Sequence, residues 1–489
     1  MELLAPAGNV DKLRYCYTYG ADAAYIGLKN FSLRIKADNF YEDEYKKVLE
    51  LKKNFPGRRL HCALNISFHN EEIDRLLSEI DYFKQYPIDA FIVQDLGIVP
   101  ILQKHFPDAE LHLSTQASCI NREAVKMYKS LGFKRVVMGR EASLAEISEI
   151  KQAVPDMEIE CFVHGAMCIA YSGRCLMSAY LNGRSAQSGF CSHTCRWDYD
   201  LLADPDILKD PKKLAQSGAL SLKEYKRPDE LFPVYEGDNF TAILSSKDLC
   251  MIDYLAEFKK AGVDSLKIEG RMKSIYYVAM ITRAYRKAID SLEGKISAQE
   301  AKPFIDELYK VSHRPFTTAF YFDKAKADET ASGASDSPYE LSAELGKQLS
   351  AQEEESILAK ASESAAKRKA EYDALVPQAQ AAYDLRVKNM PDKYLPYAEK
   401  IPGFKMYPLK AMNMINKESE LELVTPDTVA QKITREHFVL INPESGEVYN
   451  WVCDGHPCVI YTDLPVIDGA LLRCRDPEYV EGQFRDTGR

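Results

Sequence analysis

The sequence lacks several features that would assign it to a familiar class. No apolar run approaches the length of a membrane-spanning helix. The first residues, MELLAPAGNVDKL, contain neither a basic segment nor a long apolar one, so no secretory signal is expected. The formal net charge of −10 argues against a general nucleic-acid-binding protein. Together with twelve cysteines, these absences indicate a cytoplasmic protein that uses thiols for metal binding or redox chemistry, without a membrane partner.

Motifs of common enzyme classes are also missing. The chain has no HExxH motif of zinc peptidases and no GxSxG motif of serine hydrolases. It has no GxGxxG turn that would bind a dinucleotide. A metal-dependent peptidase would therefore have to use another constellation, and the best one available is His164 with Cys168 and Glu160.

Four of the twelve cysteines gather in the polar part of one stretch, residues 160–197. An apolar run at 159–163 predicts a buried strand, and a segment rich in Gly and Ser follows it. The cysteines of this segment are Cys168, Cys175, Cys191 and Cys195. Ordinary buried cysteines lie among apolar neighbours, but these four do not. A bound metal or cluster would supply folding energy that such a loop otherwise lacks.

The spacing of these cysteines bears on which metal they would bind. Structural zinc sites usually contain two short CxxC-like pairs. Here the gaps are six, fifteen and three residues, which suits an iron–sulfur cluster better and leaves zinc as the alternative. Disulfides are not expected in a chain without export signals.

The first 290 or so residues alternate short apolar runs with helical patterns. The predicted strands are 3–7, 23–28, 60–66, 90–93, 110–114, 135–138, 157–163 and 263–268. The longest helical pattern between and after them covers 275–292. Eight such units predict an α/β fold, a TIM-type (β/α)8 barrel, with a doubly wound open sheet as the alternative. A cysteine-bearing insertion at 165–245 separates strands seven and eight.

Polar residues follow the predicted strands, where a barrel of this type places its functional groups. They include Asn65, Gln94, Asp95, Gln116, Arg140, Glu141, His164, Glu269 and Arg271. Arg140 and Arg271 would face one cavity. Guanidinium groups match carboxylate and phosphate, so an anionic ligand is one interpretation. Two local ion pairs with Glu141 and Glu269 that close the barrel rim are the other.

The pattern changes after residue 320. Residues 321–400 are expected to form a linker and a helical segment, because 350–389 is rich in Ala, Glu, Lys and Ser. Residues 401–489 contain short apolar runs separated by turn residues, which predicts a small all-β domain. The barrel with its insertion would then occupy residues 1–320.

Four segments of this chain, VHGAMCIAYSGRCLMS, GFCSHTCRWDY, LSSKDLCMIDYL and SLKIEGRMKS, closely resemble peptidase family U32, the collagenase-like proteins. Shorter motifs, LAPAGN, ALNI, QDLG, LSTQAS and GRE, occur in the order that the family shows. The resemblance covers roughly residues 1–320, and the β domain resembles the family's C-terminal domain. The chain departs from the family at 350–389 and after Thr425.

The resemblance implies a hydroxylation factor. One branch of the family acts on the wobble uridine of tRNA, one on a cytidine of ribosomal RNA, and one binds a [4Fe-4S] cluster in ubiquinone biosynthesis. By likeness to that last branch, the cluster ligands here are Cys168, Cys175, Cys191 and Cys250. Cys195 competes with Cys191 for the third position.

The first hypothesis is therefore a cluster-dependent factor that forms 5-hydroxyuridine in tRNA, with a prephenate-like carboxylate as co-substrate. The residues expected to act in catalysis are His164, Glu269 and Arg271, the first two in proton transfer. The residues expected to bind substrate are Arg140, Glu141, Gln116 and Asn65. A metal-dependent peptidase, a ribosomal RNA hydroxylation factor and a noncatalytic cluster-binding scaffold are the alternatives.

Overall fold

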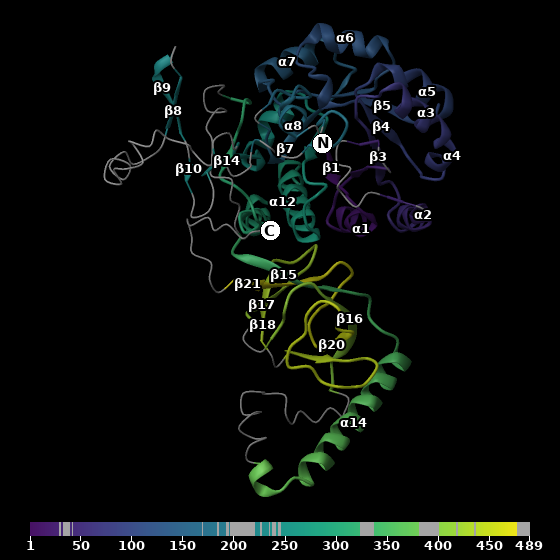
Figure 1. Cartoon of the computed structure of the whole chain (residues 1–489), viewed down its shortest axis with the longest axis vertical. Coiled ribbons are helices and arrows are strands. Elements are labelled where there is room, and N and C mark those ends of the chain that lie inside the picture. Colours follow the sequence, from purple (N-terminus) through teal and green to yellow (C-terminus); the bar gives the residue numbers. More distant parts are fainter. Residues whose placement is uncertain are drawn as a thin grey trace. The chain divides into compact units, whose positions relative to one another are not determined.

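In the computed structural model, the N-terminal part of the chain forms a closed barrel of eight parallel strands surrounded by helices (Figure 1). The strands are β1 (Glu2–Pro6), β2 (Ala23–Ile26), β3 (Arg59–Leu64), β4 (Ala90–Val93), β5 (Glu110–Leu113), β6 (Arg135–Val137), β7 (Glu158–Ala166) and β13 (Ser265–Ile268). They pair in sequence order, and β13 closes the barrel by pairing with both β1 and β7. The predicted TIM-type barrel is confirmed.

The structure describes most of the chain. The described residues are 1–28, 31–32, 40–41, 43–168, 170–182, 185–191, 195, 221–224, 227–233, 235–236, 241–242, 246–322, 337–380, 401–416, 419–434 and 437–476. Much of the predicted insertion and residues 381–400 of the predicted connecting segment lie outside these ranges.

The helices that follow the barrel strands each bury apolar side chains, and several of them begin at a residue whose side chain caps the first turn. The main ones are α1 (Val10–Thr18), α2 (Glu44–Asn54), α3 (Asn70–Ser78), α5 (Val99–His105), α6 (Arg122–Ser130), α7 (Leu144–Ala153), α11 (Leu255–Lys260) and α12 (Ile275–Leu292). At α7, Ser143 and Glu146 form a reciprocal capping box. α12 is mostly buried and begins at the N-cap Ser274. Among the described residues, no helix is both long and apolar enough to cross a membrane.

The longest barrel strand, β7, pairs near its carboxyl end with a further strand that is not part of the barrel. Its last residues pair antiparallel with β12 (Asp248–Cys250), which also pairs with β14 (Phe316–Thr317). This short strand was not predicted, because three residues carry too little periodicity to stand out. The described strands of the insertion, β8 (Ser221–Glu224), β9 (Arg227–Pro233), β10 (Tyr235–Glu236) and β11 (Thr241–Ala242), lie in sequence between barrel strands seven and eight, as predicted.

The chain divides into two compact units, and the second covers Ser337–Glu481. It contains a seven-stranded antiparallel sheet in the order β18, β17, β21, β15, β16, β20, β19. Their bounds are β15 (Tyr339–Leu345), β16 (Lys405–Ala411), β17 (Leu421–Val424), β18 (Gln431–Ile433), β19 (Phe438–Ile441), β20 (Cys458–Thr462) and β21 (Leu471–Arg475). α14 (Ala351–Asp373) packs on this sheet through Ile357 and Ala361. The C-terminal β domain is confirmed, and β15 adds a strand from within the segment predicted as linker and helix.

Candidate functional site

A polar cavity lies at the carboxyl ends of the barrel strands, and we call it the barrel-mouth cavity. Five of the predicted site residues line it, namely Asn65, Gln116, Arg140, Glu269 and Arg271. They come from the ends of β3, β5, β6 and β13, which are far apart in sequence. Parallel barrel strands all end on the same face, so the closed sheet brings these side chains together.

The charged groups of this cavity favour an anionic ligand. Arg271 is 3% exposed, and its Nη2 donates to Ser32 Oγ at 3.0 Å. The Arg140 guanidinium lies 4.0 Å from the centre of the Phe162 ring, and its Nη2 is 3.8 Å from Glu269 Oε2. Two guanidinium groups therefore line the cavity with one carboxylate, which leaves an excess of positive charge. Arginine is well suited to bind carboxylate or phosphate in such a site.

A third cation, Lys267, lines the same cavity and was missed by the sequence analysis. Its Nζ donates to Glu160 Oε1 at 2.8 Å, and Arg135 Nη1 donates to Glu160 Oε2 at 2.9 Å. Burial raises the pKa of the Glu160 carboxyl, but Lys267 and Arg135 outweigh burial and lower that pKa to about 2. A buried ionic network thus supports the floor of the cavity. The signal was a lysine between two apolar residues, Leu266 and Ile268, in the strand predicted at 263–268.

His164 does not belong to the residues that line either cavity of this site. It is 2% exposed and packs against the rings of Tyr277, Tyr285 and Phe316. Burial lowers the pKa of the imidazole to about 3, so the ring is neutral at pH 7. The register of β7 against β13 shifts just before His164, and such irregularities change the direction of side chains.

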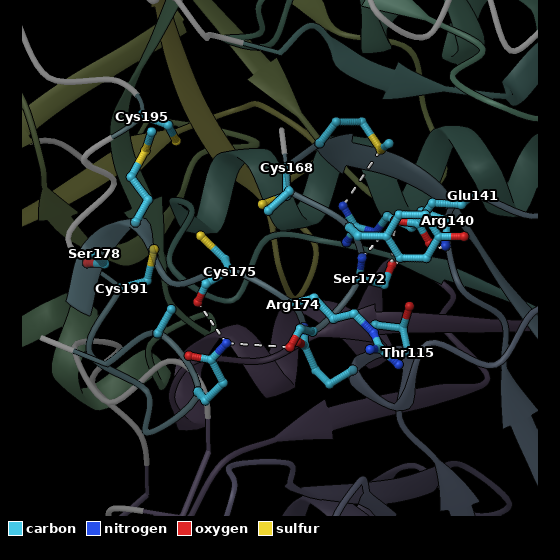
Figure 2. A pocket seen from close by; sticks show the side chains of 18 of the residues that line it. Thr115, Arg140, Glu141, Cys168, Ser172, Arg174, Cys175, Ser178, Cys191 and Cys195 are labelled. Atoms are coloured by element: carbon cyan, nitrogen blue, oxygen red, sulfur yellow. Dashed lines mark hydrogen bonds between the residues drawn. The ribbon is translucent and has the colours of Figure 1, made fainter. Parts of the chain in front are cut away.

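A second cavity, the cysteine cavity, lies beside the first (Figure 2). The two cavities share Thr115, Gln116 and Arg140 as lining residues. The cysteines that line the second cavity are Cys168, Cys175, Cys191 and Cys195. In the view of Figure 2, Arg140 and Glu141 lie on the opposite side from Cys191 and Cys195. The cysteine cavity and the barrel-mouth cavity are therefore separated by one shared wall.

The structure brings three of the four predicted cluster ligands together and leaves Cys250 apart. Cys250 lies on β12, opposite His164 in the strand register, and is 9% exposed. Burial raises the pKa of its thiol to about 11. Cys195 lines the cysteine cavity in its place, together with Cys168, Cys175 and Cys191.

The donor set of the cysteine cavity is of the kind that an iron–sulfur cluster takes. Within the described ranges, no three His, Cys, Asp or Glu side chains are grouped closely enough to hold one metal ion. A cluster takes thiolates on separate iron atoms, so its ligands stand further apart than those of one ion. Four cysteine thiols line this cavity, and a [4Fe-4S] cluster takes four thiolate ligands.

Hydrogen bonds hold the segment between Cys168 and Cys175 against the barrel. Ser172 donates from its backbone N and from Oγ to Glu141 Oε1, at 2.7 and 3.1 Å. Ser118 Oγ donates to the carbonyl of Ser172. The predicted substrate residue Glu141 therefore lines the cysteine cavity and positions its loop. These hydrogen bonds stabilise the loop in addition to any metal that it binds.

The same loop makes a close backbone approach at Gly173. Its φ is +74°, and a Cβ added there would lie 2.0 Å from the carbonyl oxygen of Gln116. Only glycine fits such a position. Gln187 then ties the far end of the loop by donating from Nε2 to the carbonyl of Cys175 at 2.7 Å. The turn before Cys175 is fixed on both sides.

Comparisons with known proteins agree with this architecture. The model of peptidase family U32 matches residues 8–331. The chain is 40% identical over 324 residues to tRNA hydroxylation protein P1 of Bacillus subtilis (strain 168), covering 65% of this chain and 70% of that one. It is 37% identical over 341 residues to tRNA hydroxylation protein P of Escherichia coli (strain K12), covering 65% and 74%. The chain belongs to peptidase family U32.

Proposed function

We propose that this chain is a tRNA hydroxylation factor that forms 5-hydroxyuridine at the wobble position, using a [4Fe-4S] cluster and a prephenate-like carboxylate. One observation carries the proposal: the cationic barrel-mouth cavity and the thiol-lined cysteine cavity share the wall formed by Thr115, Gln116 and Arg140. The relatives named tRNA hydroxylation proteins support tRNA as the substrate.

In this proposal, the barrel-mouth cavity binds the carboxylate co-substrate. Arg140 and Arg271 hold its carboxylate groups, and Asn65 and Gln116 donate or accept hydrogen bonds at the rim. Glu269 is the group placed for proton transfer, because it lines the cavity beside Arg140. His164, which we predicted for that step from the sequence, lies outside this lining.

The cysteine cavity would hold the cluster through Cys168, Cys175 and Cys191. The fourth thiolate comes from Cys250, as the family resemblance implies, or from Cys195, which lines the cavity. When bound, a [4Fe-4S] cluster supplies one-electron chemistry next to the anion site. Glu141 and Ser172 keep the loop in place through their hydrogen bonds.

The peptidase alternative finds less support in the geometry. A hydrolase needs a base within reach of its substrate or of a bound water. His164, the base of the best peptidase constellation, is buried among aromatic rings, and Glu160 is fully buried with Lys267 and Arg135. Neither side chain lines a cavity of the site.

Nucleoside analysis of a deletion strain tests the proposal. We expect 5-hydroxyuridine derivatives to disappear from its tRNA and to return with the wild-type gene, but not with Arg271→Met. Arg122→Ala, an exposed arginine on α6, is the matched control and should restore them. Unchanged tRNA in the deletion strain, with 5-hydroxycytidine lost from its ribosomal RNA, would instead support the ribosomal alternative.

A further inference from the structure

Two outward-facing side chains stand at the cysteine cavity without a role in the site described above. Tyr171 is 46% exposed although it lines the cavity, and Arg174, three residues later, is exposed and also lines it. Large aromatic side chains usually bury most of their surface. An exposed ring and an exposed guanidinium that line the same cavity are suited to bind a ligand at the surface.

The backbone that carries these two side chains is fixed. Arg174 N donates to the carbonyl of Tyr171 at 2.9 Å, which closes the turn 171–174. Inside the turn, Ser172 is bonded to Glu141, and Gly173 packs directly against the backbone of Gln116. The turn therefore presents both side chains at a constant position, and a ligand that binds them loses little free energy to loop ordering.

Arg174 has charge available for a ligand. Its Nε is 3.3 Å from Ser118 Oγ, a contact that orients the guanidinium without neutralising it. In the part of the chain that the structure describes, no carboxylate lies within ion-pair distance of Arg174. The group that meets it should therefore carry negative charge.

We propose that Tyr171 and Arg174 form a platform for one unpaired nucleotide of RNA, with the base stacked on the Tyr171 ring and a phosphate bound to Arg174. This inference rests on the proposed RNA hydroxylation and names how that substrate is held. Proteins recognise single-stranded RNA by stacking splayed bases on aromatic rings and by contacting the backbone with cations. The wobble nucleotide lies in an unpaired loop, so its base is free to stack here and enter the cavity.

The acidic character of the chain bears on how it would hold RNA. With a net charge of −10, the protein lacks the general electrostatic attraction that holds many proteins on RNA. Local contacts then carry a larger share of the affinity. A stacking ring and a cation without an acidic partner, fixed beside the cavity, supply contacts of that kind.

Binding of a fluorescein-labelled anticodon stem–loop RNA with uridine at the wobble position, followed by fluorescence anisotropy with the full chain, tests the platform. We expect Tyr171→Ala to weaken binding about tenfold, since loss of base stacking on an aromatic ring has an effect of this order. Tyr171→Phe keeps the ring and should bind as the wild type does. Arg174→Ala should weaken binding and reduce the slope of log affinity against log salt by about one.

Two control variants match the changes in size and exposure. Tyr41→Ala removes a ring that is 41% exposed, and Arg122→Ala removes an exposed guanidinium, both away from the cavity lining. Both should bind the stem–loop normally. Circular dichroism of all variants should match the wild type, because the side chains that are removed are exposed.

The outcomes separate this inference from the proposed function. Wild-type affinity in Tyr171→Ala overturns the platform while the deletion-strain result still stands. Equal weakening of a fully paired hairpin, which has no unpaired base to stack, also overturns it. If the wild type does not bind the stem–loop, the platform is rejected, and an unchanged level of 5-hydroxyuridine in the deletion strain then rejects the proposed function as well.

Discussion

The two adjoining cavities are built in different ways. The barrel-mouth cavity takes its charged groups from strand ends, and Lys267 and Arg271 are only 4% and 3% exposed. The cysteine cavity takes its thiols from a loop segment, where Cys168 is exposed and Cys175 and Cys191 are partly exposed. Buried charges on strands are held in fixed positions, whereas thiols on a loop remain accessible to an incoming metal.

This contrast separates two physical tasks. Recognition of a small anion benefits from cations that are already desolvated and positioned, because charge–charge interactions strengthen as water is excluded. Assembly of the proposed cluster would need thiols that reagents can reach and a backbone that already lies close to its final form. The hydrogen bonds of Ser172 and Gln187 supply such a backbone. The following changes test the comparison, from the largest expected effect to the smallest.

The largest effect is expected from the accessible thiols. Cys168→Ser, Cys175→Ser and Cys191→Ser should each lose most of the bound iron, because a serine hydroxyl is a poor substitute for a thiolate ligand. Iron and acid-labile sulfide per chain after anaerobic purification, together with the absorption spectrum, measure this. A full complement of iron in all three variants would contradict the assignment of the cluster to the cysteine cavity.

The same measurement on Cys195→Ser and Cys250→Ser identifies the fourth ligand. Loss of iron in Cys195→Ser alone would identify Cys195, which lines the cavity, as the fourth ligand. Loss in Cys250→Ser alone would show that β12 releases its thiol on cluster binding, since Cys250 is buried opposite His164.

Next in size is the buried network below the anion site. Glu160→Gln leaves Lys267 and Arg135 without their buried carboxylate, and we expect unfolding free energy to fall by about 3 kcal/mol. Urea unfolding followed by far-ultraviolet circular dichroism measures this. Glu158→Gln removes a carboxylate from the same Arg135 at a side chain that is 29% exposed, and should cost less than about 1 kcal/mol. Equal losses of unfolding free energy in Glu160→Gln and Glu158→Gln would show that burial of the carboxylate makes no difference here.

A change at the anion site should weaken ligand binding without loss of stability. Arg271→Lys keeps the charge but removes the guanidinium fork, so we expect about tenfold weaker binding of prephenate. Isothermal titration calorimetry with prephenate measures this on the purified chain. Iron content should remain normal, because Arg271 lines only the barrel-mouth cavity. Normal affinity for prephenate in Arg271→Lys would mean that Arg271 does not bind the carboxylate of this ligand.

The smallest effect at neutral pH is expected at His164. Its pKa is lowered from 6.5 to about 3, so the stability from its neutral form is complete above pH 6.5 and is lost as pH falls towards 3. Burial also lowers the pKa of His61 and His112, which add to the same acid sensitivity. His164→Gln should reduce the loss of stability between pH 6.5 and 4.5 by about 2 kcal/mol.

Urea unfolding at several pH values measures this change. His437→Gln is the control, because that ring is 44% exposed and lies beside Asp463. An unchanged pH profile in His164→Gln would mean that this imidazole takes up its proton without leaving the folded structure.

The elements with strong periodicity were predicted well. The helix expected at 275–292 has the observed bounds, Ile275–Leu292, and all eight barrel strands lie where apolar runs stand in the sequence. Polar residues after those strands, such as Asn65 and Arg271, line one cavity as expected. Closure of the barrel brings all strand ends to the same face, whatever the details of side-chain packing. β12, with three residues, and β15, within a segment predicted as linker and helix, were missed.

The sequence by itself determined the barrel, the polar strand ends and the thiol-rich loop, since hydrophobic periodicity and residue type are local properties. Only the tertiary structure decided which groups meet. His164 packs among aromatic rings, next to a shift in the strand register. Lys267 lines the barrel-mouth cavity and is bonded to Glu160. Cys195, and not Cys250, lines the cysteine cavity. Such placements depend on register and loop path, which arise from contacts between segments distant in the chain.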